Sequence, residues 1–251
     1  MSELLPQLIQ QLFNGLSLGA IYALIAIGYT MVYGIIGMIN FAHGEIYMIG
    51  AYVGLVTLSA IGTQSGLPVY VIIGLMLLVA VVLTGVYGFV VEQVAYKPVR
   101  HGPRLVALIS AIGMSIFLQN WVALGQGARD MAVPSLIPGA LRFGAEGAFE
   151  IYIPYSRVMI IVVAVALMIA LTLYIKHSRM GRASRACSQD MHMANLLGID
   201  TNRVISFTFI LGAMLAAVGG VLIALAVGKL NPFIGFLVGI KAFTAAVLGG
   251  I

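Results

Sequence analysis

Long stretches without a charged side chain constrain this sequence more than any other feature. Between residues 4 and 91 the only Asp, Glu, Lys or Arg is Glu45, and further uncharged runs cover residues 105–128, 158–175 and 204–228. A membrane-spanning helix needs about 20 apolar residues, because each residue rises about 1.5 Å and the hydrocarbon layer is about 30 Å thick. The runs therefore predict a chain that crosses a membrane several times.

The composition agrees with this prediction. Hydrophobic residues make up 61% of the chain and charged residues 8%, against about a quarter charged in soluble domains, and the mean hydropathy is +1.08. Because the sequence lacks the alternating pattern of a membrane barrel, only helices can satisfy the backbone. We predict an all-α integral membrane protein, a polytopic helix bundle. The single cysteine excludes an internal disulfide framework, and no zinc-ligand spacing indicates a metal.

The full spans can be placed from the uncharged runs and from the turn-forming residues at 62–68. We predict one transmembrane domain over residues 1–251, with spans near residues 12–33, 46–61, 69–91, 105–124, 157–175 and 204–228. Residues 34–45 add a broken or re-entrant segment, and a short apolar stretch ends the sequence. Because no Lys or Arg precedes the first span, we expect it to be retained rather than cleaved as a signal peptide.

Lysine and arginine gather in two connecting loops, residues 92–104 and 176–203. Such loops are retained in the cytoplasm, so we expect both on that side. The segment between them, residues 125–156, carries charges of both signs and is predicted to be external. Counting spans back places the N-terminus outside. The net charge of +5 thus follows from membrane topology and does not indicate a nucleic-acid partner.

Residues 34–45 hold the polar side chains Asn40, His43 and Glu45 within an otherwise apolar region. One interpretation is a helix broken at membrane depth, whose ionisable groups border a transport pathway. The alternative is an ordinary helix end, where the helix dipole favours the Glu45 carboxylate near the N-terminus of the second helix. The spacing alone favours the helix end.

Other polar residues near the ends of spans have simpler interpretations. Glu92 and Lys97 are expected to mark an interfacial helix end. Gln119 and Asn120 could line an external vestibule, but we expect solvation at the interface.

The second basic loop contains a predicted amphipathic helix over residues 186–199. Its apolar residues recur at helical spacing and should share one face: Cys187, Met191, Ala194 and Leu197. We expect Gly198 to end the helix in the left-handed conformation, and Thr201 or Asn202 to cap the next one. Such a helix either lies on membrane lipid or enters a groove on a partner protein.

Several stretches are specific enough to indicate a family. The run Asn-Phe-Ala-His-Gly-Glu at 40–45 belongs to the most recognisable of them, and the matching stretches cover residues 22–45, 107–120, 178–183, 231–236 and 241–250 in order. The sequence resembles the branched-chain amino-acid ABC transporter permeases of the LivH type.

The resemblance implies a permease subunit of a bacterial ATP-driven importer of leucine, isoleucine and valine in the inner membrane. The implied partners are a sister permease of the LivM type, two ATPases of the LivG and LivF type, and a periplasmic amino-acid binding protein. ATP and magnesium would be used by the ATPases. This chain lacks a Gly-x-x-x-x-Gly-Lys-Ser/Thr loop, so we expect no cofactor on it and no enzymatic activity of its own.

The resemblance also assigns roles to residues. The cytoplasmic helix would be the coupling helix that docks on an ATPase, although only Ala194 and Gly198 match the Glu-Ala-Ala-x-x-x-Gly signature of ABC permeases. The break at residues 34–45, with Asn40, His43 and Glu45, would border the pathway or its cytoplasmic gate. Members of the family continue with further spans, whereas the ten residues after Lys241 cannot cross a membrane. The resemblance therefore implies a shortened chain.

Other transport classes remain as alternatives. A related permease for urea or short amides would look similar, because selectivity is expected to lie largely in the binding protein. An ion-coupled secondary transporter would carry broken helices at matching places in two halves, whereas the sequence indicates one break and one buried carboxylate. A channel would carry a filter motif, and none is evident.

Overall fold

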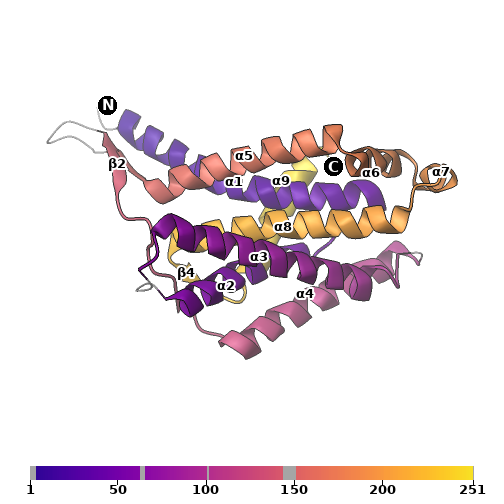
Figure 1. Cartoon of the computed structure of the whole chain (residues 1–251), viewed down its shortest axis with the longest axis horizontal. Coiled ribbons are helices and arrows are strands. Elements are labelled where there is room, and N and C mark those ends of the chain that lie inside the picture. The colour runs from indigo at the N-terminus through magenta and orange to yellow at the C-terminus, as the bar shows by residue number, and fades with distance from the viewer. Residues whose placement is uncertain (1–3, 63–65, 101, 144–150, 251) are drawn as a thin grey trace.

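The structure, a computed structural model, describes residues 4–62, 66–100, 102–143 and 151–250. Within these residues six helices are long and apolar enough to cross a membrane. They lie side by side in one elongated bundle (Figure 1). The predicted polytopic all-α fold is confirmed.

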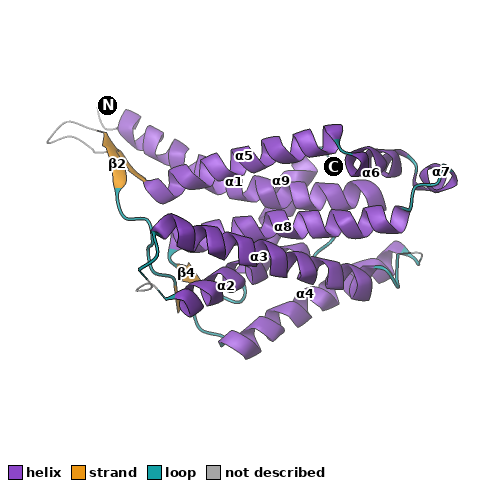
Figure 2. Cartoon of the chain, in the orientation of Figure 1, coloured by secondary structure: helices purple, strands orange, loops and turns teal. Residues whose placement is uncertain are grey.

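The long helices are α1 (Leu4–Ile36), α2 (His43–Ile61), α3 (Val69–Val91), α4 (Arg104–Gln126), α5 (Tyr155–His177) and α8 (Thr201–Val227). Shorter helical elements are the π-helix η1 (Glu92–Tyr96), α6 (Arg179–Gln189), α7 (Met191–Leu196) and α9 (Ile234–Leu248). Four short strands, β1 (Met131–Ala132), β2 (Ala140–Phe143), β3 (Ile151–Pro154) and β4 (Lys229–Leu230), form the antiparallel pairs β1–β4 and β2–β3. Figure 2 shows how small this sheet content is beside the helices.

The helix bounds differ from the predicted spans mainly at the start of the chain. The first helix begins at Leu4 rather than near residue 12. The last long helix ends at Val227, because Gly228 adopts a left-handed φ of 74° that a right-handed helix cannot continue.

Both basic loops lie at the same end of the bundle. Residues 97–100 and the helices α6 and α7 are at one end in Figure 1, whereas the start of α1 and strand β2 are at the other. By the distribution of Lys and Arg, the first end is the cytoplasmic one. Residues 144–150 of the predicted external segment lie outside the described residues.

Helix α8 forms the centre of the bundle. Its most apolar window is 72% buried, compared with 11% for α5. Small residues allow this central position: a methyl group built on Gly220 would lie 2.7 Å from the backbone nitrogen of Ala51 in α2, and one on Gly50 would lie 3.0 Å from the Ala217 side chain. Membrane helices approach this closely only where such residues face one another.

Two breaks that share a glycine and an asparagine interrupt the bundle, which corrects the prediction of a single one. The first break (residues 37–42) follows α1 at Gly37, with φ 68°, and the second break (residues 228–233) follows α8 at Gly228, with φ 74°. In each break, the backbone N–H of the first residue of the next helix donates a hydrogen bond to the backbone carbonyl of an asparagine. The donor and acceptor are His43 N and Asn40 O, 3.0 Å apart, in the first break, and Ile234 N and Asn231 O, 3.1 Å apart, in the second. The second break escaped prediction because it has no buried carboxylate close behind it as the first break has in Glu45.

The two breaks belong to an inverted repeat. The sequences Gly-Met-Ile-Asn-Phe-Ala-His-Gly at 37–44 and Gly-Lys-Leu-Asn-Pro-Phe-Ile-Gly at 228–235 match in glycine and asparagine positions. A methyl group on Gly212 would lie 3.4 Å from Gly28 O, and one on Gly219 would lie 3.7 Å from Ile21 Cγ2. The helices α1 and α8 are therefore antiparallel. Broken helices at corresponding places in inverted repeats typically flank the transport site of membrane transporters.

Candidate functional site

The first break folds back into the bundle before α2 begins. His43, the first residue of α2, lies against Gly28 of α1. Gly28 stands eight residues before the end of α1 at Ile36, which corresponds to about 12 Å along the helix. The N-terminus of α2 is thus a helix end, as the simpler interpretation held, but it lies inside the bundle.

Glu45 is fully buried in the first turn of α2. Its Oε1 accepts hydrogen bonds from Ser115 Oγ at 3.1 Å and Gln119 Nε2 at 2.7 Å, both on α4. Its Oε2 lies beside Gly235 of α9 and has no hydrogen-bond partner among the described residues. Glu45 therefore connects the starts of α2 and α9 to α4.

His43 occupies a different environment from Glu45. Residues two apart in a helix point about 200° apart, and the His43 ring packs edge-on against Tyr29 with centroids 4.8 Å apart. Its Nε2 faces the backbone of Gly28, and within the described part of the chain nothing bonds to it. The structure therefore does not bring His43 and Glu45 into one site.

Asn40 connects the first break to the cytoplasmic end of α3. Its Oδ1 accepts a hydrogen bond of 2.7 Å from the hydroxyl of Tyr96, and both side chains are buried. In the second break the equivalent residue, Asn231, donates to Asp130 Oδ1 at 2.6 Å. Each break is thus tied by its asparagine to a connecting segment at its own end of the bundle.

A groove of about 490 Å³ separates α4 from α9, and we call it the α4–α9 groove. Its lining consists of Phe41, Ile112, Ser115, Ile116, Gln119, Phe233, Phe236 and Leu237. The two polar members, Ser115 and Gln119, are the residues that hold Glu45. The expectation that Gln119 is simply solvated at the interface is therefore wrong, because one turn of α4 brings it together with Ser115 on the side facing α2.

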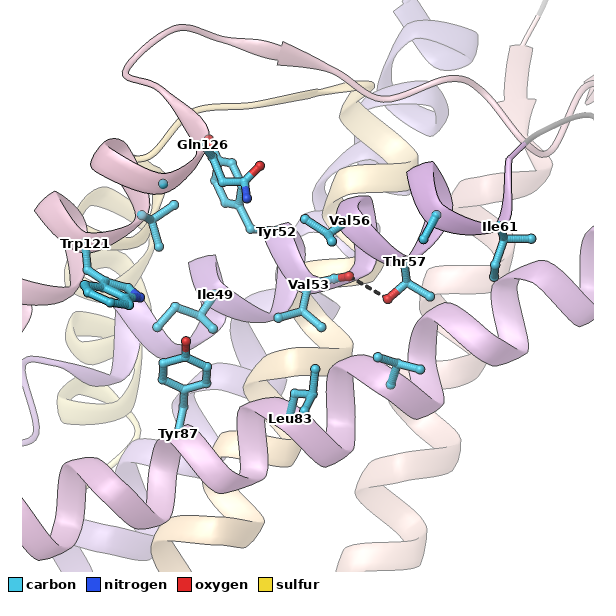
Figure 3. A pocket seen from close by; sticks show the side chains of 14 residues that line it. Ile49, Tyr52, Val53, Val56, Thr57, Ile61, Leu83, Tyr87, Trp121 and Gln126 are labelled. Atoms are coloured by element: carbon cyan, nitrogen blue, oxygen red, sulfur yellow. Dashed lines mark hydrogen bonds between the residues drawn. The ribbon is translucent and has the colours of Figure 1, made fainter.

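A second pocket of about 450 Å³ lies between α2, α3 and α4, towards the external end of α2. Figure 3 shows apolar and aromatic side chains from these three helices around it, including Tyr52, Tyr87 and Trp121. Its main internal hydrogen bond, from Thr57 Oγ1 to Val53 O at 2.8 Å, stays within one helix. Neither this pocket nor the α4–α9 groove has a charged residue in its lining, but only the groove contains residues that bond to the buried Glu45.

The cytoplasmic segment forms two helices rather than the single predicted helix over 186–199. Asp190 separates α6 from α7 with φ −154° and ψ 105°, and its Oδ1 accepts from Met193 N at 2.9 Å. Aspartate stabilises a new helix start by capping it, which here outweighs continuation of the first helix. We call this α6–α7 arrangement the elbow.

The predicted apolar face is only partly present in the elbow. Cys187 and Ala194 are buried and Met191 is half-buried, whereas Leu197 is 77% exposed, because the second helix turns away at Asp190. The neighbouring Leu196 is 69% exposed. The elbow therefore presents two leucines outward at its tip.

The end of the elbow follows the predicted form closely. Gly198 has a left-handed φ of 84°, as expected. The cap of α8 is Asp200, which accepts from Arg203 N at 3.2 Å and also pairs with its side chain at 3.0 Å. The predicted caps, Thr201 and Asn202, already lie inside the helix, because the carboxylate of the preceding residue takes the capping position.

Glu92 is fully buried at the cytoplasmic end of α3, not interfacial as expected. Its Oε2 accepts from Ser206 Oγ of α8 at 2.8 Å and from Gln93 Nε2 at 2.5 Å. Arg100, which also bonds to Asn202, stands 3.9 Å from its Oε1. This polar cluster joins η1 to the first turns of α8, directly after the elbow.

No three His, Cys, Asp or Glu side chains in the described residues lie close enough together to hold a metal ion. The geometry is therefore that of a membrane bundle with two breaks, a buried carboxylate between them and an exposed cytoplasmic elbow. The family described as branched-chain amino acid transport system, permease component, matches residues 11–251.

This chain belongs to that permease family. It is 54% identical over 251 residues to the high-affinity branched-chain amino acid transport system permease protein LivH of Salmonella typhimurium, covering 100% of this chain and 82% of the relative. It is 53% identical over 243 residues to the permease protein BraD of Pseudomonas aeruginosa, covering 97% and 79%. No solved structure gives a significant match.

A more distant relative is also a permease. The ribose import permease protein RbsC of Haemophilus influenzae is 26% identical over 244 residues, covering 96% of this chain and 69% of the relative. The resemblance inferred from the sequence is thus confirmed. With its six membrane-spanning candidates, the permease is a multi-pass protein of the inner membrane and a transport component rather than an enzyme.

Proposed function

We propose that this permease forms the translocation pathway of an ATP-driven importer of leucine, isoleucine and valine. The observation that carries the proposal is the 54% identity, over the full chain, to a high-affinity branched-chain amino acid permease. The inverted repeat with two broken helices supports alternating access, since such repeats can expose a central site to either side in turn.

The energy would come from two partner ATPases of the LivG and LivF type, which use ATP and magnesium. The elbow is the proposed contact with one of them. Cys187, Met191 and Ala194 pack it against the bundle, and the exposed Leu197 is available to a groove on the partner. Gly198 and Asp200 then pass a displacement of the elbow directly into α8, the central helix.

The other proposed partners are a sister permease of the LivM type and a periplasmic amino-acid binding protein. The binding protein would deliver substrate at the external end of the bundle, where the second break is tied to Asp130. The first break, with Asn40, His43 and Glu45, would border the pathway nearer the cytoplasm.

Uptake of labelled leucine tests the proposal. The chain is expressed with its partner subunits in cells that lack their own branched-chain uptake, and the control omits the ATPases. We expect saturable leucine uptake that isoleucine and valine compete for, and that disappears in the control. Uptake that persists without the ATPases, or that urea rather than valine competes for, would overturn it.

Single substitutions test the pathway assignment separately. Asn40→Ala, His43→Ala and Glu45→Gln are compared at matched expression. We expect each to lower leucine uptake, and wild-type transport from all three would remove these residues from the pathway.

A further inference from the structure

The orientation of the Gln119 amide is fixed by Glu45. A carboxylate only accepts hydrogen bonds, so the amide group at 2.7 Å from Oε1 must present its NH₂. The carbonyl oxygen of Gln119 therefore points away from Glu45. Because Gln119 lines the α4–α9 groove, this oxygen is the acceptor that the side chain can offer to the groove.

Hydrogen-bond acceptors thus gather at one side of the groove, where Ser115 and Gln119 stand between it and the buried Glu45. Ser115 donates its hydroxyl hydrogen to the same carboxylate and keeps only acceptor capacity. Glu45 itself does not line the groove, and its Oε2 lies beside Gly235. The polar side of the groove therefore suits a cationic group that donates hydrogen bonds.

The remaining lining is apolar and includes three phenylalanines: Phe41, Phe233 and Phe236. The volume of about 490 Å³ lies within the range of roughly 300–1,000 Å³ usual for small-molecule sites. Such a groove matches a ligand with an ammonium group at one end and an aliphatic side chain at the other.

The position of the groove supports a transport role. Phe41 belongs to the first break and Phe233 to the second, so the groove lies where the two halves of the inverted repeat meet. Substrate sites of transporters with inverted repeats lie at such junctions of broken helices.

We propose that the α4–α9 groove is the site in this permease that receives the amino acid during translocation. The ammonium group donates to the carbonyl oxygen of Gln119, and the aliphatic side chain lies against the phenylalanines. Glu45 is a positioning residue that holds the amide of Gln119 in the receiving orientation. The inference rests on the proposed function, because it takes a branched-chain amino acid as the ligand.

Protection of an engineered cysteine tests the site in the purified complex. Ile116, which lines the groove and is 55% exposed, is replaced by cysteine in a Cys187→Ala background. The matched control is Ile109→Cys on the same helix, 62% exposed and outside the lining. We expect leucine at roughly ten times its dissociation constant to slow maleimide alkylation of I116C about tenfold and that of I109C not at all.

Two further arms test the chemistry. The keto acid 4-methyl-2-oxopentanoate has the side chain and carboxylate of leucine but no ammonium group, and we expect it not to protect I116C. Gln119→Leu and Glu45→Gln should each abolish the slowing by leucine, measured against the alkylation rate of the same variant without leucine.

The outcomes separate this inference from the proposed function. Equal protection by the keto acid would overturn the role of the Gln119 carbonyl. Alkylation of I116C that leucine does not slow would overturn the site. An I116C that reacts in the isolated chain but not in the complex would also overturn it, because a partner helix would then cover the groove. Leucine uptake by the wild-type complex in the same preparation would show that the proposed function survives such a result.

Discussion

Gly44 of α2 and Gly235 of α9 pack backbone against backbone where the two broken helices cross. A methyl group on Gly235 would lie 2.6 Å from the carbonyl oxygen of Gly44, and one on Gly44 would meet the Gly235 carbonyl and lie 2.9 Å from Gly239 Cα. The two glycines hold equivalent positions in the inverted repeat, so this contact lies on its symmetry axis. Side chains larger than hydrogen cannot occupy it without separating the helices.

Gly44→Ala and Gly235→Ala are therefore expected to destabilise the bundle. Overpacking of this kind costs about 1–3 kcal/mol or more, because the obstructing atoms are backbone rather than flexible side chains. Thermal stability in detergent, followed by size-exclusion chromatography, measures the effect. The matched control is Gly34→Ala in α1, where a methyl group meets nothing within 4 Å. Equal stability of all three variants would contradict the observed packing.

The sequence predicted the number of spans and the end of the elbow because these depend on local features. Uncharged length determines whether a helix can cross a membrane, and a glycine after the last turn indicates a left-handed end, as at Gly198. The second break was missed because Lys229, the charged residue within it, directly follows an uncharged run and so resembles the ordinary end of a span. Its similarity to the first break becomes evident only once both are seen to interrupt long helices.

Of the candidate site, the sequence indicated Glu45 but neither its bonds to Ser115 and Gln119 nor the groove between α4 and α9. His43 and Glu45 were noticed because they are ionisable residues in an otherwise apolar region. Residues two positions apart in a helix point in nearly opposite directions, however, so the two side chains contact different neighbours. The role of Gln119 depends on which residue of α2 meets α4, 74 positions away in the sequence. Contacts between such distant residues are decided by helix packing and leave no local pattern.

Tyr96→Phe should loosen the first break from the end of α3. The variant removes the donor to Asn40 Oδ1 and leaves a buried acceptor without its bond, which costs about 1–3 kcal/mol. We expect a lower midpoint of thermal unfolding, and no further loss when Asn40→Ala is added, since both changes remove the same bond. Tyr70→Phe, at a tyrosine that is 77% exposed, is the control. Additive losses in the double variant would show that the bond does not connect the two residues energetically.

Ser206→Ala should weaken the connection between η1 and α8. Its hydroxyl donates to the fully buried Glu92 at 2.8 Å, and a buried charge that loses a donor is costly. We expect stability to fall by about 1–3 kcal/mol and leucine uptake to fall further than ATP hydrolysis by the complex, because α8 follows the elbow directly. Ser188→Ala, at an exposed position in α6, is the control. A proportional fall of uptake and hydrolysis would argue against a role for this cluster in coupling.

Replacing Leu196 and Leu197 by serine should uncouple the permease without unfolding it. Both side chains are more than two-thirds exposed at the tip of the elbow, so their removal costs the isolated chain little. On a partner surface, however, each buried leucine contributes about 1.5–3 kcal/mol. We expect the double variant to lose co-purification with the ATPases. Leu124→Ser, at an 86% exposed leucine at the external end of α4, should retain them. Retention of the ATPases by the elbow variant would place their docking surface elsewhere.

The thiol of Cys187 reports on whether the elbow stays packed against the bundle. Its side chain is buried, and burial raises the pKa of the thiol. Because the thiolate is the reacting species, alkylation by maleimide should be slow at pH 7 and should accelerate as pH rises towards the raised pKa. Because folding favours the neutral thiol, the thiol contributes to the stability of the packed elbow at pH values below its unfolded-state pKa of about 8.5. This contribution is lost as the pH rises through the higher pKa of the thiol in the folded protein. Ser188→Cys in a Cys187→Ala background moves the thiol by one residue to an exposed position and should react rapidly at pH 7. Equal rates for the two thiols would show that the elbow does not remain docked in solution.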